Sequence, residues 1–343
     1  MASQDQVTVV VDVMGGDEPP QVVLDGIAAA LAADPALTIL AAGPADLVAP
    51  FCNEHERALP LIAEQAIGMG DDPIEAVMRK RKSSIVLGCR AVKKGQAQGF
   101  FSAGSTGAIV AAATAYVTPE KVLGSDGKRR PIRPCITSAL PNRAGGLTVF
   151  CDMGGSPDVE PEDMVRFAQM GSAYATAVLG IEHPRVGLLS NGTEEHKGSA
   201  FTKRCYPLMA ERVPGFAGNC EGGDLTSGNV DVVVCDGFTG NVALKATEGA
   251  ARLLLGEMKA TLLGSLKGKI AALLIKDALH GIKDKLSGDA RGGAILLGLH
   301  GVVLIGHGAT SVEAVKNGAL ATAQAVRAGL VQRVASSMPN VVG

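Results

Sequence analysis

Residues 231–245 combine the chemical groups that an anion-binding site needs. A β-branched run at residues 231–235 predicts a buried strand, and residues 242–258 have the composition and spacing of a helix. Glycine and polar residues turn the chain between them: Asp236, Gly237, Thr239, Gly240 and Asn241. A strand, a glycine turn and a helix in this order direct free backbone N–H groups and the positive helix end toward bound anions. Lys245 follows about one turn into the helix and adds a full positive charge, so this stretch predicts an anion site.

The same order of strand, turn and helix recurs at four other places. The strands are predicted at residues 7–11, 99–102, 147–151 and 186–189. The turns after them share glycine, hydroxyl and carboxylate groups: Asp12, Gly15, Gly16 and Asp17; Ser102, Gly104, Ser105, Thr106 and Gly107; Asp152, Gly154, Gly155 and Ser156; Ser190, Asn191, Gly192, Thr193 and Glu194. We expect all five turns at the same edge of one sheet, where they form one crevice for a small anionic substrate.

Composition limits the classes of protein that fit. The chain has 343 residues, of which 47% are hydrophobic and 3% aromatic, without tryptophan, and its formal charge is −2. Few aromatic side chains and a nearly neutral charge argue against a nucleic-acid partner. The seven cysteines are scattered singly and the six histidines lack ligand spacing, so we expect buried thiols and no metal site.

The cellular location is expected to be the cytoplasm. Residues 1–6 lack a basic segment and Asp12 interrupts the apolar run that follows, so no secretion signal is predicted. The longest apolar stretch, residues 294–306, is too short to span a bilayer.

The elements that position these turns alternate between strand and helix from residue 7 to about residue 334. This alternation predicts an α/β fold, a three-layer α/β/α sandwich with a mostly parallel sheet. We expect one catalytic domain at 1–335 and a tail at 336–343. Further strands are expected at 37–42 and 136–139, an exposed loop at 118–134 and a last helix at 312–334.

Residues 247–287 are expected to form a helical hairpin within this domain. Leucines and isoleucines between 262 and 286 lie near helical spacing, and six lysines between 259 and 285 occupy much of the rest, while Gly264 and Gly268 argue against one continuous helix. Two interpretations remain open. The hairpin packs on a second subunit, which we favour, or its basic amphipathic surface contacts anionic lipid or an acidic partner.

Nucleotide and hydrolase motifs are absent. The nearest match to a dinucleotide fingerprint, Gly306-His307-Gly308, has Ser311 at the third glycine position, and neither a Walker A motif nor GxSxG occurs. The sequence therefore predicts a phosphate site without a nucleotide, and no cofactor.

Several segments taken together resemble one known family. They are VDVMGGD at 11–17, SAGSTGA at 102–108, MGSAYA at 170–175, PRVGLLSNGTEEHKG at 184–198, DVVVCDGFTGNVALK at 231–245 and GGA at 292–294. The chain resembles the PlsX phosphate acyltransferases of bacterial phospholipid synthesis, nearly from end to end. The resemblance implies an acyl-ACP:phosphate transacylase that makes acyl phosphate for a membrane glycerol-3-phosphate acyltransferase (PlsY-like). It also implies a homodimer with a Rossmann-like fold similar to phosphotransacetylases and isocitrate-dehydrogenase-like proteins.

The chain departs from the family pattern at four places. Glu18 stands where a histidine is common, Ser105 replaces an asparagine, Ser190-Asn191 replaces Asn-Val, and residues 289–291 replace an Asn-Tyr-like pair. The residues expected to carry the reaction remain: Thr193, Glu194, Lys197, Asp236, Asn241 and Lys245.

The expected mechanism is direct attack of bound phosphate on the thioester, without a covalent enzyme intermediate. Lys197 and Lys245 are predicted to stabilise negative charge, and Asn241 with the turns at 104–107 and 237–240 to donate hydrogen bonds. Asp236 is predicted to orient a turn or a lysine. Asp12, Asp152 and Asp236 each have an alternative interpretation as helix N-caps, which we favour for Asp12 and Asp152. Lys245 is explained equally well as an exposed helix residue.

An acidic acyl carrier protein requires a basic docking surface, and three segments are candidates: 79–82, 128–130 and 259–285. The last turn of a helix is an equally good explanation for the cations at 79–82. Three rival functions stay open: an NAD(P)-dependent decarboxylating dehydrogenase, a covalent acyl-cysteine route through Cys151 or Cys235, and a non-catalytic scaffold that recruits lipid-synthesis partners to the membrane.

Overall fold

The structure is a computed structural model that describes residues 6–123, 127–276, 281, 292–308 and 310–339. Within these residues, eleven strands form one sheet in the order β10-β9-β11-β8-β7-β12-β13-β4-β1-β2-β3. Their bounds are β1 Val7–Asp12, β2 Leu37–Gly43, β3 Ala58–Ile62, β4 Gly99–Ser102, β7 Cys135–Pro141, β8 Leu147–Cys151, β9 Val186–Leu189, β10 Phe216–Cys220, β11 Val232–Val234, β12 Ala294–Leu297 and β13 Val302–Ile305. Two further strands, β5 Lys121–Leu123 and β6 Arg129–Pro131, form a separate hairpin.

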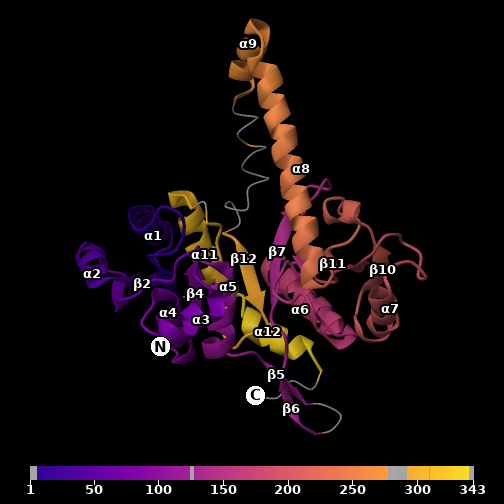
Figure 1. Cartoon of the computed structure of the whole chain (residues 1–343), viewed down its shortest axis with the longest axis horizontal. Helices are drawn as coiled ribbons and strands as arrows, with labels where there is room; N and C mark the ends of the chain where they lie inside the picture. The colour runs from indigo at the N-terminus through magenta and orange to yellow at the C-terminus, as the bar shows by residue number, and fades with distance from the viewer. Residues whose placement is uncertain (1–5, 124–126, 277–280, 282–291, 309, 340–343) are drawn as a thin grey trace.

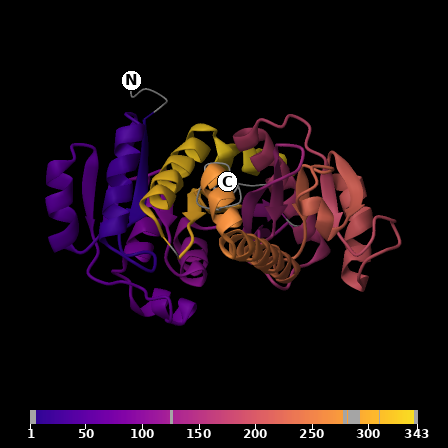
Figure 2. The same ribbon diagram turned by 90° about the horizontal axis from the view of Figure 1, so that it is seen from above.

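Helices cover both faces of the sheet (Figures 1 and 2). One face packs against α1 Gln21–Ala33, α6 Pro161–Leu179, α7 Ala200–Arg212, α11 Val312–Arg327 and α12 Leu330–Ser337. The other face packs against α3 Pro73–Arg79, α4 Ser84–Lys93, α5 Thr106–Ala112, the π-helix Ala113–Val117, the 3-10 helix Gly222–Leu225 and the start of α8 Gly237–Leu263. Among the described residues, the remaining helices are α2 Ala45–Glu54, near β3, and α9 Leu266–Leu274, which follows α8. The predicted three-layer α/β/α arrangement is confirmed.

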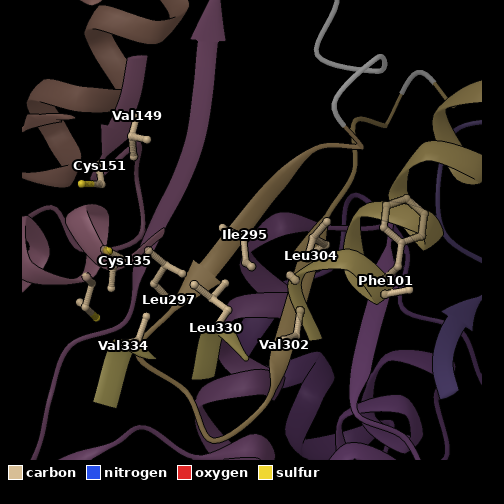
Figure 3. Close-up of a cluster of buried hydrophobic side chains, with 14 of the residues drawn as sticks. Phe101, Cys135, Val149, Cys151, Ile295, Leu297, Val302, Leu304, Leu330 and Val334 are labelled. Carbon is tan, nitrogen blue, oxygen red and sulfur yellow. The ribbon is translucent and has the colours of Figure 1, made fainter. Parts of the chain in front are cut away.

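The core follows from the alternation of side chains along the strands. Val9 and Val11 of β1 point to the face that carries α1 and α11, while Val10 points to the opposite face. At the centre of the molecule, Leu297 of β12 and Val302 of β13 pack with Leu330 and Val334 of α12, while Phe101 of β4 packs against Gly318 of α11 (Figure 3). Each such side chain contributes about 1.5–3 kcal/mol when it leaves water.

The two halves of the sheet run in opposite directions. Strands β3, β2, β1, β4 and β13 are parallel, as are β10, β9, β11 and β8. Between them, β13 and β12, β12 and β7, and β7 and β8 are antiparallel pairs. Three reversals leave the halves opposed. The turns after β1 and β4 therefore lie at one end of the strands, and the turns after β8, β9 and β11 lie at the opposite end. The expectation that all five turns lie at the same edge of the sheet is wrong.

Several elements differ from the sequence predictions. The expected loop at 118–134 contains the β5–β6 hairpin, although its basic residues are exposed as expected. Strands β3 and β10, at the outer edges of the sheet, were not predicted. Helix α8 begins at Gly237, five residues before the predicted start, because Asp236 caps it there. The predicted last helix is broken at Gly329, whose φ of 63° ends α11 and starts α12.

Helices α8 and α9 form an arm that extends away from the sheet (Figure 1). Leu253, Leu254, Leu266, Leu273 and Leu274 on this arm are each more than 60% exposed. No helix in the described part of the chain is both long and apolar enough to cross a bilayer. The rest of the predicted hairpin, residues 277–280 and 282–287, and the departure at 289–291 lie outside the described residues.

Candidate active site

The turn between β11 and α8 is held by Asp236. Its Oδ1 accepts a hydrogen bond from Thr239 N at 2.8 Å, and its Oδ2 accepts one from Thr239 Oγ1 at 2.7 Å. Asp236 is thus the N-cap of α8, and it fixes the first turn of the helix at the end of a buried valine strand.

Two glycines let this first turn pack directly on the turn after β8. A Cβ at Gly237 would lie 2.8 Å from both Asp152 Oδ2 and Ser156 O, and a Cβ at Gly240 would overlap the Asp152 carbonyl oxygen. Gly237 N donates to Ser156 O and Gly240 N to Asp236 O, each at 2.9 Å. These two N–H groups are engaged within the protein, so their predicted role as phosphate donors is not seen in this structure.

Asp152 organises the turn after β8. The residue is fully buried, and its carboxylate accepts four backbone hydrogen bonds, from Ile136 N, Gly154 N, Gly155 N and Ser156 N, at 2.6–3.3 Å. Burial raises the pKa of Asp152 to about 6, although these hydrogen bonds oppose the shift. Asp152 is not a helix N-cap, since α6 starts after Glu160. The favoured cap interpretation is wrong, and Asp152 instead orients its turn.

Asp152 is expected to make stability depend on pH. Its folded-state pKa of about 6 lies above the usual value of 3.8, so between these pH values the folded protein binds more protons than the unfolded chain. The free energy of unfolding should therefore fall by up to about 3 kcal/mol as pH rises from about 4 to about 6. Urea unfolding at several pH values across this range measures the change, and in Asp152→Asn the free energy of unfolding should no longer fall with pH. Stability of the wild type that rises over the same range would show that the four hydrogen bonds outweigh burial.

A cavity of about 470 Å³ lies beside the capped turn. Its wall is formed by the ends of β9 and β11 and by the first turns of α7 and α8: Leu188, Leu189, Ser190, Asn191, Gly198, Ser199, Phe201, Thr202, Cys235, Asp236 and Thr239, with Met164 of α6. Asn191 Oδ1 accepts from Gly198 N at 2.9 Å and closes the loop between β9 and α7. Ser190 Oγ is buried, and within the described chain it has no hydrogen-bond partner. The cavity thus combines an apolar floor with hydroxyl, amide and carboxylate groups.

Lys197 adds a cation next to this cavity. It immediately precedes Gly198, it is half-buried, and among the described residues no carboxylate pairs with its ammonium group. Gly192 makes room for its stem, because a Cβ there would lie 2.9 Å from Lys197 Cγ. Glu194 O accepts from both Lys197 N and Asn219 Nδ2, which holds the loop in place. The side chains of Thr193 and Glu194 themselves are exposed.

Asn241 and Lys245 lie on α8 outside the cavity wall. Asn241 is exposed and packs beside Gly154. Lys245 is 58% exposed, and its Nζ lies 3.0 Å from Glu248 Oε2. This pairing is typical of a solvated helix surface and favours the interpretation of Lys245 as an exposed helix residue.

The turns after β1 and β4 form a second cluster at the other edge of the sheet. Asp12 is buried, accepts from Ser102 Oγ at 2.7 Å and from Met14 N at 3.1 Å, and burial raises its pKa. Gly104 N donates to Ser102 Oγ at 3.0 Å. Position 15 requires glycine, because the Cβ of any other residue would lie 2.9 Å from Gly104 N. Asp12 therefore orients these turns and is not a helix N-cap, since α1 begins after Pro20. The cap interpretation is wrong here too.

The other predicted residues of this edge surround that cluster. A Cβ at Gly16 would collide with Thr310, Asp17 N donates to Gly308 O at 2.8 Å, and a Cβ at Gly107 would lie 2.7 Å from Pro73 Cγ. Ser105 precedes α5 without a side-chain cap hydrogen bond, and Thr106 is exposed, as is Glu18. In the described ranges of the chain, no hydrogen bond or ion pair joins this cluster to the cavity at the opposite edge.

The two cysteines of the rival covalent route are buried. Cys235 Sγ donates to Asp152 O and Cys151 Sγ to Phe167 O, each at 3.5 Å. Burial raises the pKa of the Cys235 thiol well above its usual range. A thiolate nucleophile is therefore disfavoured at Cys235. Cys151 is fully buried, so a substrate does not reach its thiol.

The fold defines a class of protein. A phosphotransacetylase from Streptococcus pyogenes has a similar structure, with a TM-score of 0.57, 16% sequence identity and 94% of each chain covered. At this identity the similarity concerns the fold. The chain is therefore an α/β/α protein with the phosphotransacetylase fold.

Sequence similarity identifies the family. Residues 7–333 match the model of the fatty acid synthesis protein family, and the chain belongs to it. A phosphate acyltransferase from Limosilactobacillus reuteri (strain DSM 20016) is 38% identical over 331 residues, covering 95% of this chain and 94% of the relative. Another, from Desulforudis audaxviator (strain MP104C), is 40% identical over 336 residues, covering 97% and 96%. The predicted resemblance is confirmed.

Proposed function

We propose that this protein is a phosphate acyltransferase that makes acyl phosphate from inorganic phosphate and the acyl thioester of a carrier protein. The observation that carries this proposal is the 38–40% identity, over almost the whole chain, to relatives named phosphate acyltransferase. The cavity beside Asp236 supports it, because hydroxyl groups line the cavity and Lys197, which no carboxylate of the described residues pairs with, directly precedes the lining residue Gly198. The dehydrogenase and scaffold alternatives have no comparable support.

The reaction is a single acyl transfer. A phosphate oxygen attacks the thioester carbonyl carbon, the carbon–sulfur bond breaks, and the proton of hydrogen phosphate goes to the thiolate that leaves. Lys197 offsets the phosphate and oxyanion charge, and Ser190 Oγ donates to one of the oxygens. Asp236 positions Thr239 and the first turn of α8. Asn241 and Lys245 are further proposed donors on the same helix.

The second cluster is proposed to bind substrate. Its members are Gly15, Gly16, Asp17, Ser102, Gly104, Ser105, Thr106 and Gly107. The same role is proposed for a separate set of residues near the cavity: Asn191, Gly192, Thr193, Glu194, Gly237, Thr239 and Gly240. The support is their position in turns that follow strands, where ligands bind in α/β proteins.

The function is tested by incubating the purified protein with acyl-ACP and inorganic phosphate. Loss of acyl-ACP that requires phosphate, with acyl phosphate detected as its hydroxamate, is the expected result. A folded protein that leaves acyl-ACP intact in the presence of phosphate would contradict the proposal.

We also propose how the chain is organised around this site. Residues 1–335 act as one catalytic domain that works as a homodimer. Residues 336–343 are proposed to be its tail. The protein supplies acyl phosphate to a membrane glycerol-3-phosphate acyltransferase, and the α8–α9 arm holds it at the membrane surface. The mass of the purified protein in solution checks the homodimer.

The arm has a surface that suits an anionic membrane. Leu266, Ile270, Leu273 and Leu274 are exposed at helical spacing, and Lys267 and Lys269 flank them. Leu273→Glu combined with Leu274→Glu should abolish co-sedimentation with vesicles containing anionic phospholipid, because the apolar stripe then carries charge. Ile74→Glu with Met78→Glu on α3, where both side chains are also more than 60% exposed, is the matched control and should bind normally. Equal vesicle binding by wild type and the Leu273, Leu274 variant would contradict a membrane role for the arm.

A further inference from the structure

The β5–β6 hairpin displays positive charge on an exposed surface. Residues 118–134 contain five basic and two acidic side chains. Lys121, Lys128, Arg129 and Arg130 are all exposed. Arg133 is also exposed and forms an ion pair with Asp163 at 3.4 Å. Lys93 of α4 adds a further cation, because its Nζ donates at 3.2 Å to Oγ1 of Thr118, which lies just before β5.

The core holds this hairpin in a fixed position. Val122 and Ile132 are buried, Ile132 N donates to Glu120 O, and Glu120 N donates to Gly298 O, each at 2.9 Å. Since Val122 points inward, its neighbours Lys121 and Leu123, with Arg129 opposite Leu123, point outward. Leu123 is 43% exposed. The outward face therefore presents Leu123 beside Lys121 and Arg129.

Short contacts connect the hairpin to the cavity. The chain leaves β6 through Pro134, whose carbonyl oxygen accepts from Ser156 Oγ at 3.5 Å, and reaches Ile136, whose N–H donates to Asp152 Oδ1 at 2.8 Å. Ser156 O in turn accepts from Gly237 N, the residue after the cavity-lining Asp236. The basic surface thus lies a few residues from the first turn of α8. In Figure 1 it is at the opposite end of the molecule from α9.

We propose that the outward face of the β5–β6 hairpin is the docking surface for an acidic carrier protein that brings the acyl thioester to the cavity. This inference rests on the proposed function. A protein helix with carboxylates around an apolar side chain complements Leu123 with Lys121 and Arg129 beside it, and Arg130, opposite Val122 in the hairpin, adds an exposed cation on the other face. A membrane is a poorer fit, because the apolar stripe that would insert into lipid lies on the arm at the other end of the molecule.

The test measures binding of fluorescently labelled acyl carrier protein by anisotropy, at low and at physiological salt. The variant Lys121→Glu, Arg129→Glu, Arg130→Glu should raise the dissociation constant at least about tenfold and lose its salt dependence. The milder variant Lys121→Gln, Arg129→Gln, Arg130→Gln should give an intermediate loss, which excludes misfolding as the cause. In turnover, both should raise KM for the carrier-bound thioester with little change in kcat.

A matched control carries the same change of charge elsewhere. Lys259→Glu, Lys267→Glu, Lys269→Glu on the arm alters three exposed lysines and should leave carrier binding at the wild-type value. Carrier binding lost in the arm variant and kept in the hairpin variant would overturn the proposal. So would unchanged binding in both variants, or vesicle binding that the hairpin variant loses while carrier binding stays intact. If the wild type itself forms no acyl phosphate, the proposed function fails, which is a separate result from any of these.

Discussion

Replacing Lys197 by alanine is expected to lower kcat by about 100-fold to 1,000-fold, the usual cost of removing one group that stabilises transition-state charge. Among the described residues no carboxylate neutralises this lysine, and it lies directly before the cavity-lining Gly198. Because Lys197 forms no ion pair within the part of the chain that the structure describes, thermal unfolding should be unaffected. Steady-state kinetics with acyl-ACP and phosphate measure the effect.

Lys203 provides the matched control for Lys197. It lies on α7, in the same region of the chain, and is exposed. Lys203→Ala should therefore keep wild-type turnover, and Lys197→Arg should recover part of the activity because it restores the charge. Wild-type kcat in Lys197→Ala would remove this lysine from the mechanism.

Replacing Gly240 by alanine should cost about 4 kcal/mol of the free energy of unfolding, near the upper end for single substitutions. In an open helix this change gains about 1 kcal/mol. Here the new Cβ would overlap the Asp152 carbonyl oxygen and crowd Cys235 Sγ, and neither can move without disturbing β8 or β11. Urea unfolding followed by circular dichroism measures the loss.

Gly249, further along the same helix, separates crowding from helix propensity. A Cβ there meets no atom within 4 Å, so Gly249→Ala should stabilise the protein by up to about 1 kcal/mol. Opposite signs for the two substitutions are the expected result. Stabilisation by both would mean that α8 does not pack against the Asp152 turn as described.

Much of the fold could be predicted because the buried strands are valine-rich and end at glycine or aspartate. The opposite directions of the two halves were missed, because the residue pattern of a strand does not show whether it pairs parallel or antiparallel with its neighbour. A signal was present: residues 142–146 form a short turn, rich in asparagine and glycine, between β7 and β8, and a short turn joins antiparallel strands. Strands β3 and β10 contain Pro60 and Gly218, which lower the strand propensity of these segments. They form strands because they pair with the neighbouring strand at each outer side of the sheet.

The candidate site was predictable to a similar extent. Asp236, Thr239 and Asn191, which were singled out because each follows a buried strand, line the cavity, and their role in binding stays a prediction. Ser199, Thr202 and Met164 were missed, because only the packing of α6 against α7 brings them to the cavity. The pairing of Lys245 with Glu248 follows from their spacing of three residues on a helix, a signal that the sequence already contained.

The place of β13 in the sheet sets the order in which the protein can fold. β13 pairs with β4, and α11 packs on α1, so the half of the sheet that begins with β1 is completed by residues 302–327, at the far end of the sequence. During synthesis, β1, β2 and β4 leave the ribosome long before their last partner and expose an unpaired edge meanwhile. This half can therefore reach its native state only after residues 302–327 have been made, and a chain truncated near residue 290 would lack the middle of its sheet.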